Sequence, residues 1–200
     1  ILKPIKPKLI YAIKVRNREI IIYSQKVVHL KNGKVVNIRL ATTQDDEKIW
    51  NMVLRLSEST MMFLRPEGFT RSDIDNWLTE SELDTMAVFV AEHTENNQQV
   101  VVALGLIYKG QFQHSHVAEL SIVVRDDFQS VGLGTQMTQF MIDYARARGL
   151  KKLILRVYAD NERAYHMYRK LGFEIEGVFL KEAFVAGKYR TIYRMCKFLD

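Results

Sequence analysis

The chain has 200 residues, of which 48% are apolar and 26% charged, and this composition is ordinary for a globular protein. No apolar run approaches the ~20 residues needed to cross a bilayer, and the Lys-rich N-terminus lacks the apolar core of a secretory signal. The single cysteine, Cys196, excludes an internal disulfide framework and favours a reducing, cytoplasmic location. Membrane-spanning and disulfide-stabilised classes are therefore not expected.

Charge is distributed unevenly along the chain. Residues 1–40 hold ten Lys/Arg and one acid, for a net charge of +9, whereas residues 41–100 hold four Lys/Arg and twelve acids, for −8. A basic N-terminal arm can bind nucleic acid, but this arm has no dense Lys/Arg cluster, and a solvated tail or hairpin explains it as well. The solvated tail or hairpin is the favoured interpretation, so neither a nucleic-acid partner nor a membrane partner is expected.

The first 35 residues predict an N-terminal extension. Two prolines within residues 1–8 favour an extended arm. Runs of β-branched and aromatic residues over 9–15 and 19–23 predict a β-hairpin. Asn32-Gly33 is a strong turn signal, after which we expect the main domain, residues 36–200, to begin.

The main domain mixes helical and strand periodicities. Pairs that resemble capping boxes, Thr43 with Asp46 and Thr70 with Asp73, predict the first two helices. The expected helices cover residues 43–57, 70–81, 132–148 and 161–171. The expected strands cover residues 35–40, 86–92, 100–108, 116–124, 153–157, 173–184 and 189–198. This order predicts an α/β fold with a mixed sheet and helices on both faces.

The segment from Val123 to Thr135 is the most informative. A strand leads through a loop of small residues into a helix, whose first N–H groups have no intrahelical acceptor and lie at the positive end of the helix dipole. Ser130, Gly132 and Gly134 leave these groups accessible to a diphosphate. Turn geometry alone also explains two glycines here, so the loop by itself is a weak indication.

A second segment joins a strand to a short helix that ends in Gly-Phe. With this segment the chain resembles the GNAT superfamily of N-acetyltransferases. Their phosphate loop reads Gln/Arg-Gly-x-Gly-x-Gly/Ala, and their later motif reads Asn-x-x-Ala-x-x-x-Tyr-x-x-x-Gly-Phe. The matching positions are Gln129, Gly132 and Gly134 in the loop, and Asn161, Ala164, Tyr168, Gly172 and Phe173 in the later motif.

The resemblance covers residues 36–198 and is clearest over residues 117–195. It has two departures: Ser130 replaces the usual first glycine, and Asp126 stands where proline is common. Serine keeps the backbone accessible, so diphosphate binding is still expected. The first 35 residues match nothing in the family.

The resemblance implies a GNAT-like, mostly antiparallel sheet and direct transfer of acetyl from acetyl-CoA to a primary amine in a ternary complex. It also implies that the strand at residues 116–124 splays from the next strand at a bulge and binds pantetheine through main-chain groups. Core packing explains the side chains in that strand equally well. The expected coenzyme-binding residues are Ile122, Val123, Val124, Gln129, Ser130, Val131, Gly132, Leu133, Gly134, Thr135, Asn161 and Ala164.

Two side chains are candidates for catalysis. The phenol of Tyr168 can donate a proton to a departing thiolate, and family members often carry a tyrosine in that role. Glu119 is the candidate base, because an alkylammonium with a pKa near ~10.4 must lose a proton before it attacks. Packing on the sheet and a structural ion pair are the respective alternatives. His114 and His116 have no third ligand at matching spacing, so no metal is expected.

The closing hairpin is similar to the ends of spermidine, ribosomal-protein and amino-acid or antibiotic acetyltransferases. The acceptor is thus expected to be a polyamine, an amino acid, an antibiotic or a protein N-terminus, bound between the loop of residues 58–70 and that hairpin. Excess acid in residues 41–100 can attract a polycation, although solvated helix faces explain it too; the residues are Glu58, Glu67, Asp73 and Asp75.

Two further possibilities stay open. A chain that keeps the coenzyme cleft without turnover would be an acyl-CoA-binding sensor or adaptor, which is the alternative function. A homodimer is expected only because homodimers are common among globular proteins.

Overall fold

The computed structural model describes residues 9–15, 18–23, 25–64, 69–80 and 85–199. The helices are α1 (Asp46–Val53), α2 (Glu58–Met61), α3 (Arg71–Glu80), α4 (Leu133–Ala147) and α5 (Glu162–Lys170). The strands are β1 (Leu9–Val15), β2 (Arg18–Tyr23), β3 (Gln25–His29), β4 (Val35–Leu40), β5 (Met86–Glu95), β6 (Gln98–Lys109), β7 (Val117–Val124), β8 (Lys152–Tyr158), β9 (Glu174–Val185) and β10 (Lys188–Phe198).

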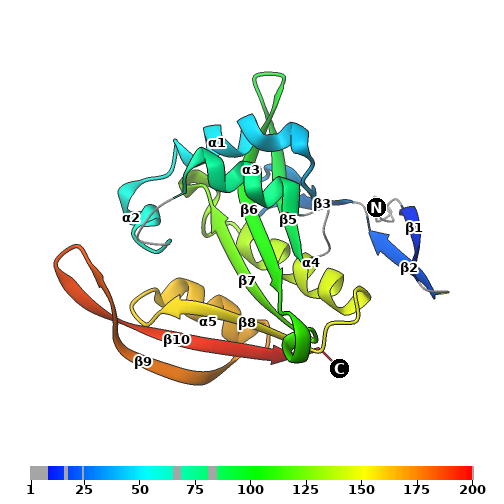
Figure 1. Cartoon of the computed structure of the whole chain (residues 1–200). Helices are drawn as coiled ribbons and strands as arrows, with labels where there is room; N and C mark the ends of the chain where they lie inside the picture. The colour runs from blue at the N-terminus through cyan, green and yellow to red at the C-terminus, as the bar shows by residue number, and fades with distance from the viewer. Residues whose placement is uncertain (1–8, 16–17, 24, 65–68, 81–84, 200) are drawn as a thin grey trace.

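Most of these strands form one sheet, in the order β3-β4-β5-β6-β7-β8-β10-β9 (Figure 1). Neighbouring strands are antiparallel except β7 and β8, which are parallel. β1 and β2 pair with each other as a separate hairpin, as predicted. The predicted fold class is confirmed: a mixed, mostly antiparallel sheet with helices on both faces.

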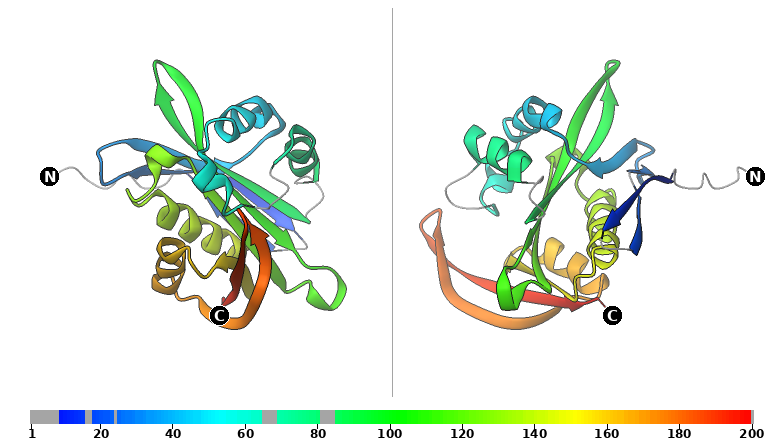
Figure 2. Two further views of the ribbon diagram at one scale, coloured as in Figure 1. Left: turned by 90° about the vertical axis from the view of Figure 1, so that its left-hand side faces the viewer. Right: turned by 45° about the vertical axis from the view of Figure 1, so that its right-hand side comes forward.

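Helices cover the two faces of the sheet in separate layers (Figures 1 and 2). α1 and α3 pack on one face through Ile49 and Ile74, whereas α4 and α5 pack on the other through Met141 and Tyr168. The side chains of β5 alternate between the two layers. Phe89 packs with α4 and α5, and the residues on either side of it pack with α1 and α3. Coverage on both sides explains the continuous apolar runs of β5 and β6, and each large buried side chain stabilises the fold by about 1.5–3 kcal/mol.

The segment expected to be an extension contributes a strand to the main sheet. β3 pairs with β4 from Gln25↔Arg39 to His29↔Val35. Val28 and Leu30 are buried in the cluster that contains α4, which explains why this strand joins the sheet. The boundary expected near residue 35 therefore falls within a continuous hairpin.

Helix starts differ in how well their capping residues were predicted. Thr70 donates its N–H to Asp73 Oδ2 at 2.8 Å, as expected for the start of α3. The first capping pair is Thr42 with Asp45, one residue earlier than predicted, and a 3₁₀ turn precedes α1. α1 also ends at Val53 instead of residue 57, and α2 forms within the segment expected to be a loop.

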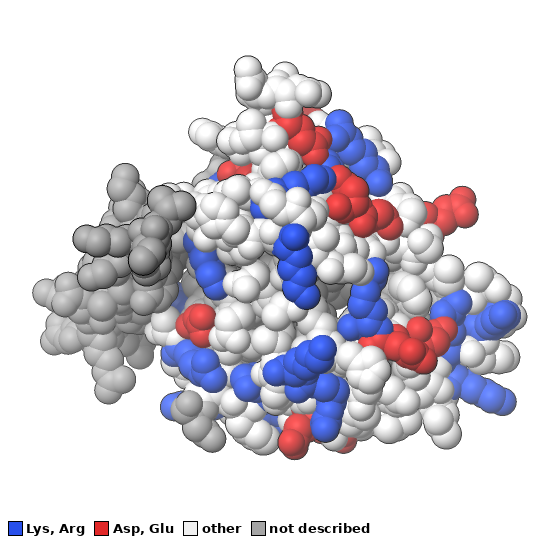
Figure 3. Space-filling model, turned by 180° about the vertical axis from the view of Figure 1, so that it is seen from behind, with Lys and Arg blue, Asp and Glu red and all other residues white. Residues whose placement is uncertain are grey.

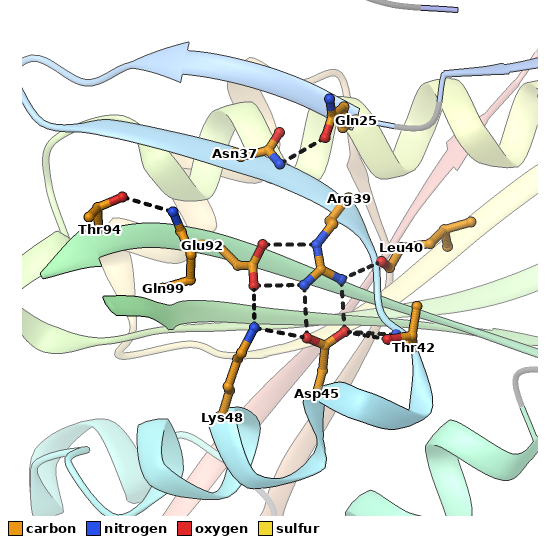
Figure 4. A network of polar contacts seen from close by, with 10 residues as sticks. All are labelled: Gln25, Asn37, Arg39, Leu40, Thr42, Asp45, Lys48, Glu92, Thr94 and Gln99. Atoms are coloured by element: carbon orange, nitrogen blue, oxygen red, sulfur yellow. Dashed lines mark hydrogen bonds and ion pairs between the residues drawn. The ribbon is translucent and has the colours of Figure 1, made fainter. Parts of the chain in front are cut away.

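Buried charges explain that one-residue shift. Asp45 is buried and accepts hydrogen bonds from Arg39 of β4, which also pairs with Glu92 of β5 at 2.7 Å (Figure 4). Lys48 of α1 completes the cluster, 3.0 Å from Glu92. Burial raises the pKa of Asp45, but the hydrogen bonds from Arg39 and Thr42 outweigh burial, so its pKa lies below the ordinary value. This ionised network fixes α1 to β4 and β5.

Candidate active site

β7 and β8 form a fork. They pair only at Val117↔Lys152, Ala118↔Leu153 and Glu119↔Ile154, although both strands continue for several residues (Figure 1). The pairing of β6 with β7 runs without a register shift, so the expected splay is present but the expected bulge is not. The fork exposes one edge of β7 along its C-terminal half.

Strand alternation shows which main-chain groups face the open fork. Arg125 donates its N–H to Val102 of β6 at 2.9 Å. In the regular antiparallel pairing of β6 and β7, the N–H and C=O of Val123 then also turn toward β6, and those of Ile122 and Val124 turn away. Ile122 and Val124, but not Val123, therefore turn main-chain groups toward the fork, and the Val124 carbonyl already accepts from the Gln129 side chain.

The loop after β7 forms a concave run of N–H groups. In the part of the chain that the structure describes, the N–H groups of six successive residues, Ser130–Thr135, have no hydrogen-bond acceptor. Ser130 (φ +61°) and Gly132 (φ +96°) adopt left-handed conformations on the two sides of Val131. Such an alternation directs successive N–H groups inward and forms an anion-binding concavity at the start of α4. We call Ser130–Thr135 the N–H cradle.

Side chains at the start of α2 hold the beginning of this loop. Asp126 accepts from the hydroxyls of Ser57 at 2.6 Å and Thr60 at 2.7 Å. The amide of Gln129 donates to Thr60 at 3.0 Å and to the carbonyl of Val124 at 2.8 Å. Asp126, noted in the sequence only as a missing proline, therefore joins the loop to α2. Ser57 and Thr60 could not be found from the sequence, because no local pattern marks a contact between residues so far apart.

α5 packs beside the cradle on the far side of the fork. A Cβ added to Gly134 would lie 3.1 Å from the sulfur of Met167, so this glycine permits α4 and α5 to approach closely. Asn161 caps α5, with its side-chain oxygen accepting from Ala164 N–H at 3.2 Å. Gly134 and Asn161, which are both predicted to bind the coenzyme, therefore also have structural roles, and both lie beside the fork.

Tyr168 is buried in α5 with its ring 5.7 Å from that of Phe173. No hydrogen-bond partner of its hydroxyl is found among the described residues, and the oxygen is not completely enclosed. Burial raises the pKa of Tyr168, so the phenol keeps its proton throughout the physiological range. A neutral phenol without a partner is available to donate a hydrogen bond.

Glu119 lies at the point where β7 and β8 separate. Its carboxylate is 4.0 Å from the Nε of Arg156 on β8, and both side chains are substantially exposed, at 40% and 59%. They lie on the opposite face of the sheet from Leu120 and Leu155, which are in the cluster with α4 and α5. Glu119 and Tyr168 are consequently on opposite faces, with the fork between them.

The end of α2 meets the closing hairpin. Arg190 of β10 donates to the sulfur of Met62 at 2.9 Å and lies over the ring of Phe63, whose centroid is 5.8 Å from that of Tyr158. The segments predicted to bound the acceptor site therefore touch each other. Arg190 also pairs with Asp160.

Other predicted features have simpler explanations or lie outside the described residues. Asp73 caps α3, and Glu67 is not among the described residues. His114 and His116 are exposed, and no cluster of three metal-binding side chains occurs among the residues that the structure describes. Cys196 is free and buried. In the same part of the chain, no helix is long and apolar enough to span a bilayer.

Comparison with known proteins identifies the family. Residues 50–173 match the model of the Acetyltransferase (GNAT) family. The chain belongs to this family. The spermidine N(1)-acetyltransferase of Escherichia coli K12 is 37% identical to this GNAT chain over 113 residues, which are 53% of the chain and 61% of that enzyme. The L-methionine sulfoximine/L-methionine sulfone acetyltransferase of Pseudomonas paraeruginosa is 37% identical over 70 residues, 35% of the chain and 37% of that enzyme. The chain thus spans less than two thirds of either relative.

Solved GNAT structures share the fold. A GNAT-family acetyltransferase from Streptococcus pneumoniae has a TM-score of 0.71 and 25% identity, covering 82% of this chain and 99% of that one. A spermidine N-acetyltransferase from Vibrio cholerae, solved in complex with CoA and spermine, has a TM-score of 0.69 and 22% identity, covering 82% and 95%.

Proposed function

We propose that this GNAT chain is an enzyme that transfers the acetyl group of acetyl-CoA directly to a primary amine. The observation that carries the proposal is the N–H cradle, Ser130–Thr135, beside the open fork of β7 and β8. Six unsatisfied donors at a helix start suit a diphosphate, and the exposed edge of β7 suits an amide-containing arm that adds to it like a strand. The relative of known structure from Vibrio cholerae binds CoA, which supports the same donor here.

The residues of the chain fit the coenzyme. The cradle would hold its diphosphate, with Gln129 keeping the loop closed on β7. Ile122 and Val124 offer main-chain groups to the pantetheine arm, and Asn161 with Ala164 forms the opposite wall at the start of α5. When bound, acetyl-CoA supplies the acetyl group as an activated thioester.

Two side chains manage the protons of the transfer. Glu119 is proposed to take a proton from the acceptor's ammonium, which frees the nitrogen lone pair for the new N–C bond. Tyr168 is proposed to donate its phenolic proton, or a hydrogen bond, to the sulfur as the C–S bond breaks. Because burial raises the pKa of Tyr168, this proton is present at any physiological pH. The site between the two faces of the sheet allows the base and the acid to act from opposite sides.

The charges near the fork favour an acceptor with a carboxylate close to its amine. On this side, Glu176 pairs with Lys152 and Arg194, and Asp160 pairs with Arg190, whereas Glu58 is exposed. These pairs reduce the negative charge that is available to a polycation. Arg156 is mostly exposed and only 4.0 Å from Glu119, so a guanidinium and a base lie side by side. Such a pair matches the carboxylate and the ammonium of an α-amino acid.

The test is CoA release from acetyl-CoA, followed by thiol detection, across spermidine, free amino acids, an aminoglycoside and short peptides. We expect amino acids to give the highest kcat/KM, and Glu119→Gln to lower it by about 10²-fold or more. Glu174→Gln, which changes an exposed acid of β9, is the matched control and should leave the rate unchanged.

Each result has a distinct meaning. Activity with spermidine but not with amino acids would reject the acceptor assignment and keep the enzyme. CoA binding without turnover on any amine would favour the sensor or adaptor function. Absence of CoA binding would reject the assignment of the cradle itself.

A further inference from the structure

The β3–β4 hairpin touches the cradle. Lys31 donates its main-chain N–H to the carbonyl of Val131 at 3.1 Å. The turn is closed by a bond from Leu30 N–H to Lys34 O at 2.8 Å, and Leu30 is buried in the main core. Main-chain contacts and core packing therefore fix the position of this turn. It precedes residues 50–173, which match the family model.

Three lysines of this hairpin surround the loop, and they differ in their partners. Lys26 donates to the side-chain oxygen of Gln136, in the first turn of α4, at 2.9 Å. Lys34 lies 3.4 Å from Asp127 and 4.0 Å from the centroid of the Phe128 ring. Lys31 is exposed, and within the described residues its ammonium has neither an ion pair nor a hydrogen bond. Lys31 is thus the lysine available to a ligand.

The acids near this turn are already occupied. Asp127 accepts from Arg125 at 2.7 Å as well as from Lys34, and Glu95 pairs with Arg125 and, at 3.5 Å, with Arg55. Their negative charges are neutralised within this cluster, which leaves the charge of Lys31 without a counter-ion. Figure 3 shows Lys and Arg side chains scattered over the face seen from behind, with acidic side chains between them. Scattered charge suits a small anion better than an extended polyanion.

We infer that Lys31 binds the 3′-phosphate of coenzyme A. This inference rests on the proposed function. The cradle offers main-chain donors to the diphosphate, but the coenzyme also carries a phosphomonoester on its ribose. That group bears a charge of about −1.5 to −2 at pH 7 and needs a cation outside the cradle. A lysine whose backbone is bonded to Val131 is positioned to supply that cation at the rim of the cradle.

The test compares coenzyme A with 3′-dephospho-coenzyme A by calorimetric titration. Lys31→Ala should raise the Kd for coenzyme A by about three- to tenfold, because one partly exposed charge-assisted contact is lost. The same variant should leave the Kd for 3′-dephospho-coenzyme A unchanged. Lys31→Arg should restore binding of coenzyme A, and the difference should shrink in high salt. Lys151→Ala, at an exposed lysine just before β8, is the matched control and should change neither Kd.

The outcomes separate this inference from the proposed function. Lys31 contributes its main-chain N–H to the fold, so the alanine variant should unfold at the wild-type temperature. An equal loss for both ligands would overturn the assignment to the 3′-phosphate, and no loss for either would overturn a role for Lys31 altogether. Either result would leave coenzyme binding by the cradle intact. If the wild-type chain bound neither ligand, the proposed function would fail first.

Discussion

The proposed donor and acceptor sides of this molecule are built from different chemical groups. The donor side consists of main-chain N–H groups in Ser130–Thr135 and of the exposed edge of β7. The acceptor side consists of side chains that come from α2, β8 and β10 and meet around Phe63 and Arg190. A site made of backbone depends on small residues at fixed spacing, whereas a site made of side chains can change with any one of them.

This difference explains why one side carries a motif and the other does not. The cradle requires left-handed conformations at Ser130 and Gly132, and a close approach at Gly134, so few residue types are allowed there. Arg156 and Arg190 occupy ordinary strand positions that many residue types could fill. The residues proposed to bind the acetyl donor can therefore be recognised in the sequence, whereas those proposed to bind the acceptor cannot.

The largest expected effect concerns the buried ion network that attaches α1, on the same face of the sheet as Glu119, to β4 and β5. Asp45→Asn should lower the free energy of unfolding by about 3 kcal/mol, because Arg39 then loses its buried carboxylate partner. Coenzyme affinity should not change, since the network lies away from the cradle. Asp46→Asn is the matched control, with a partly exposed pair to Arg71, and should cost well under 1 kcal/mol. Urea unfolding and calorimetric titration measure the two quantities. A parallel loss of coenzyme affinity would show that the two sides are not independent.

Tyr168→Phe tests the chemistry between the two sides. The variant should lower kcat by about 10²-fold and leave coenzyme affinity and stability close to wild type, because no described residue bonds to the hydroxyl. Tyr165→Phe, in the same helix, controls for loss of any phenol from α5 and should keep its rate. Steady-state kinetics with a saturating acceptor give the comparison. An unchanged kcat in Tyr168→Phe would assign this tyrosine to packing alone.

Gly132→Ala tests the cradle against the cost of backbone strain. Gly132 (φ +96°) and Gly149 (φ +77°) both have left-handed conformations and open space where a Cβ would stand. Alanine should therefore cost about 1–2 kcal/mol of stability at either position. Only Gly132→Ala should also raise the Kd for coenzyme A, by about tenfold, because the N–H groups of the cradle would no longer point toward the diphosphate. Thermal unfolding and titration distinguish strain from binding, and equal affinities in the two variants would argue against the cradle.

Acid should produce the smallest effect. Burial raises the pKa of Asp45 and Glu92, but hydrogen bonds from Arg39 outweigh it, so both values lie below the ordinary 3.8 and 4.5. A folded-state pKa below the unfolded one stabilises the fold above the unfolded pKa, and this contribution is lost as pH falls through the folded value. The free energy of unfolding should therefore decline below about pH 4.5, and it should decline less steeply with falling pH in Asp45→Asn. Urea midpoints from pH 3 to 7 test this, and parallel slopes would contradict it.

Much of the fold was predictable because its elements depend on local patterns. The strands from β5 to β10 and helices α3, α4 and α5 lie within a few residues of their predicted ranges. β3 was missed because its apolar residues are few and its partner strand decides its place. The capping pair at Asp45 was displaced by one residue because a distant partner, Glu92, shares Arg39 with it.

The candidate site divides in the same way. The loop and the later motif mark Gln129, Asn161 and Tyr168 through their spacing. The contacts of Lys31 with Val131 and of Ser57 with Asp126 join residues 69 or more positions apart, and no local pattern records them. The orientation of Val123 toward β6 likewise follows from pairing and not from residue type.

The hydroxyl of Thr60 has a consequence for how this protein can evolve. It donates to Asp126 and accepts from Gln129, so a single oxygen satisfies two partners at the start of the loop after β7. A hydrophobic residue in its place would leave a carboxylate oxygen and an amide N–H without that partner at the same time. Substitutions at positions 60, 126 and 129 are therefore expected to be inherited together. Descendants that alter their acceptor by reshaping α2 will have to keep this trio or replace it as a set.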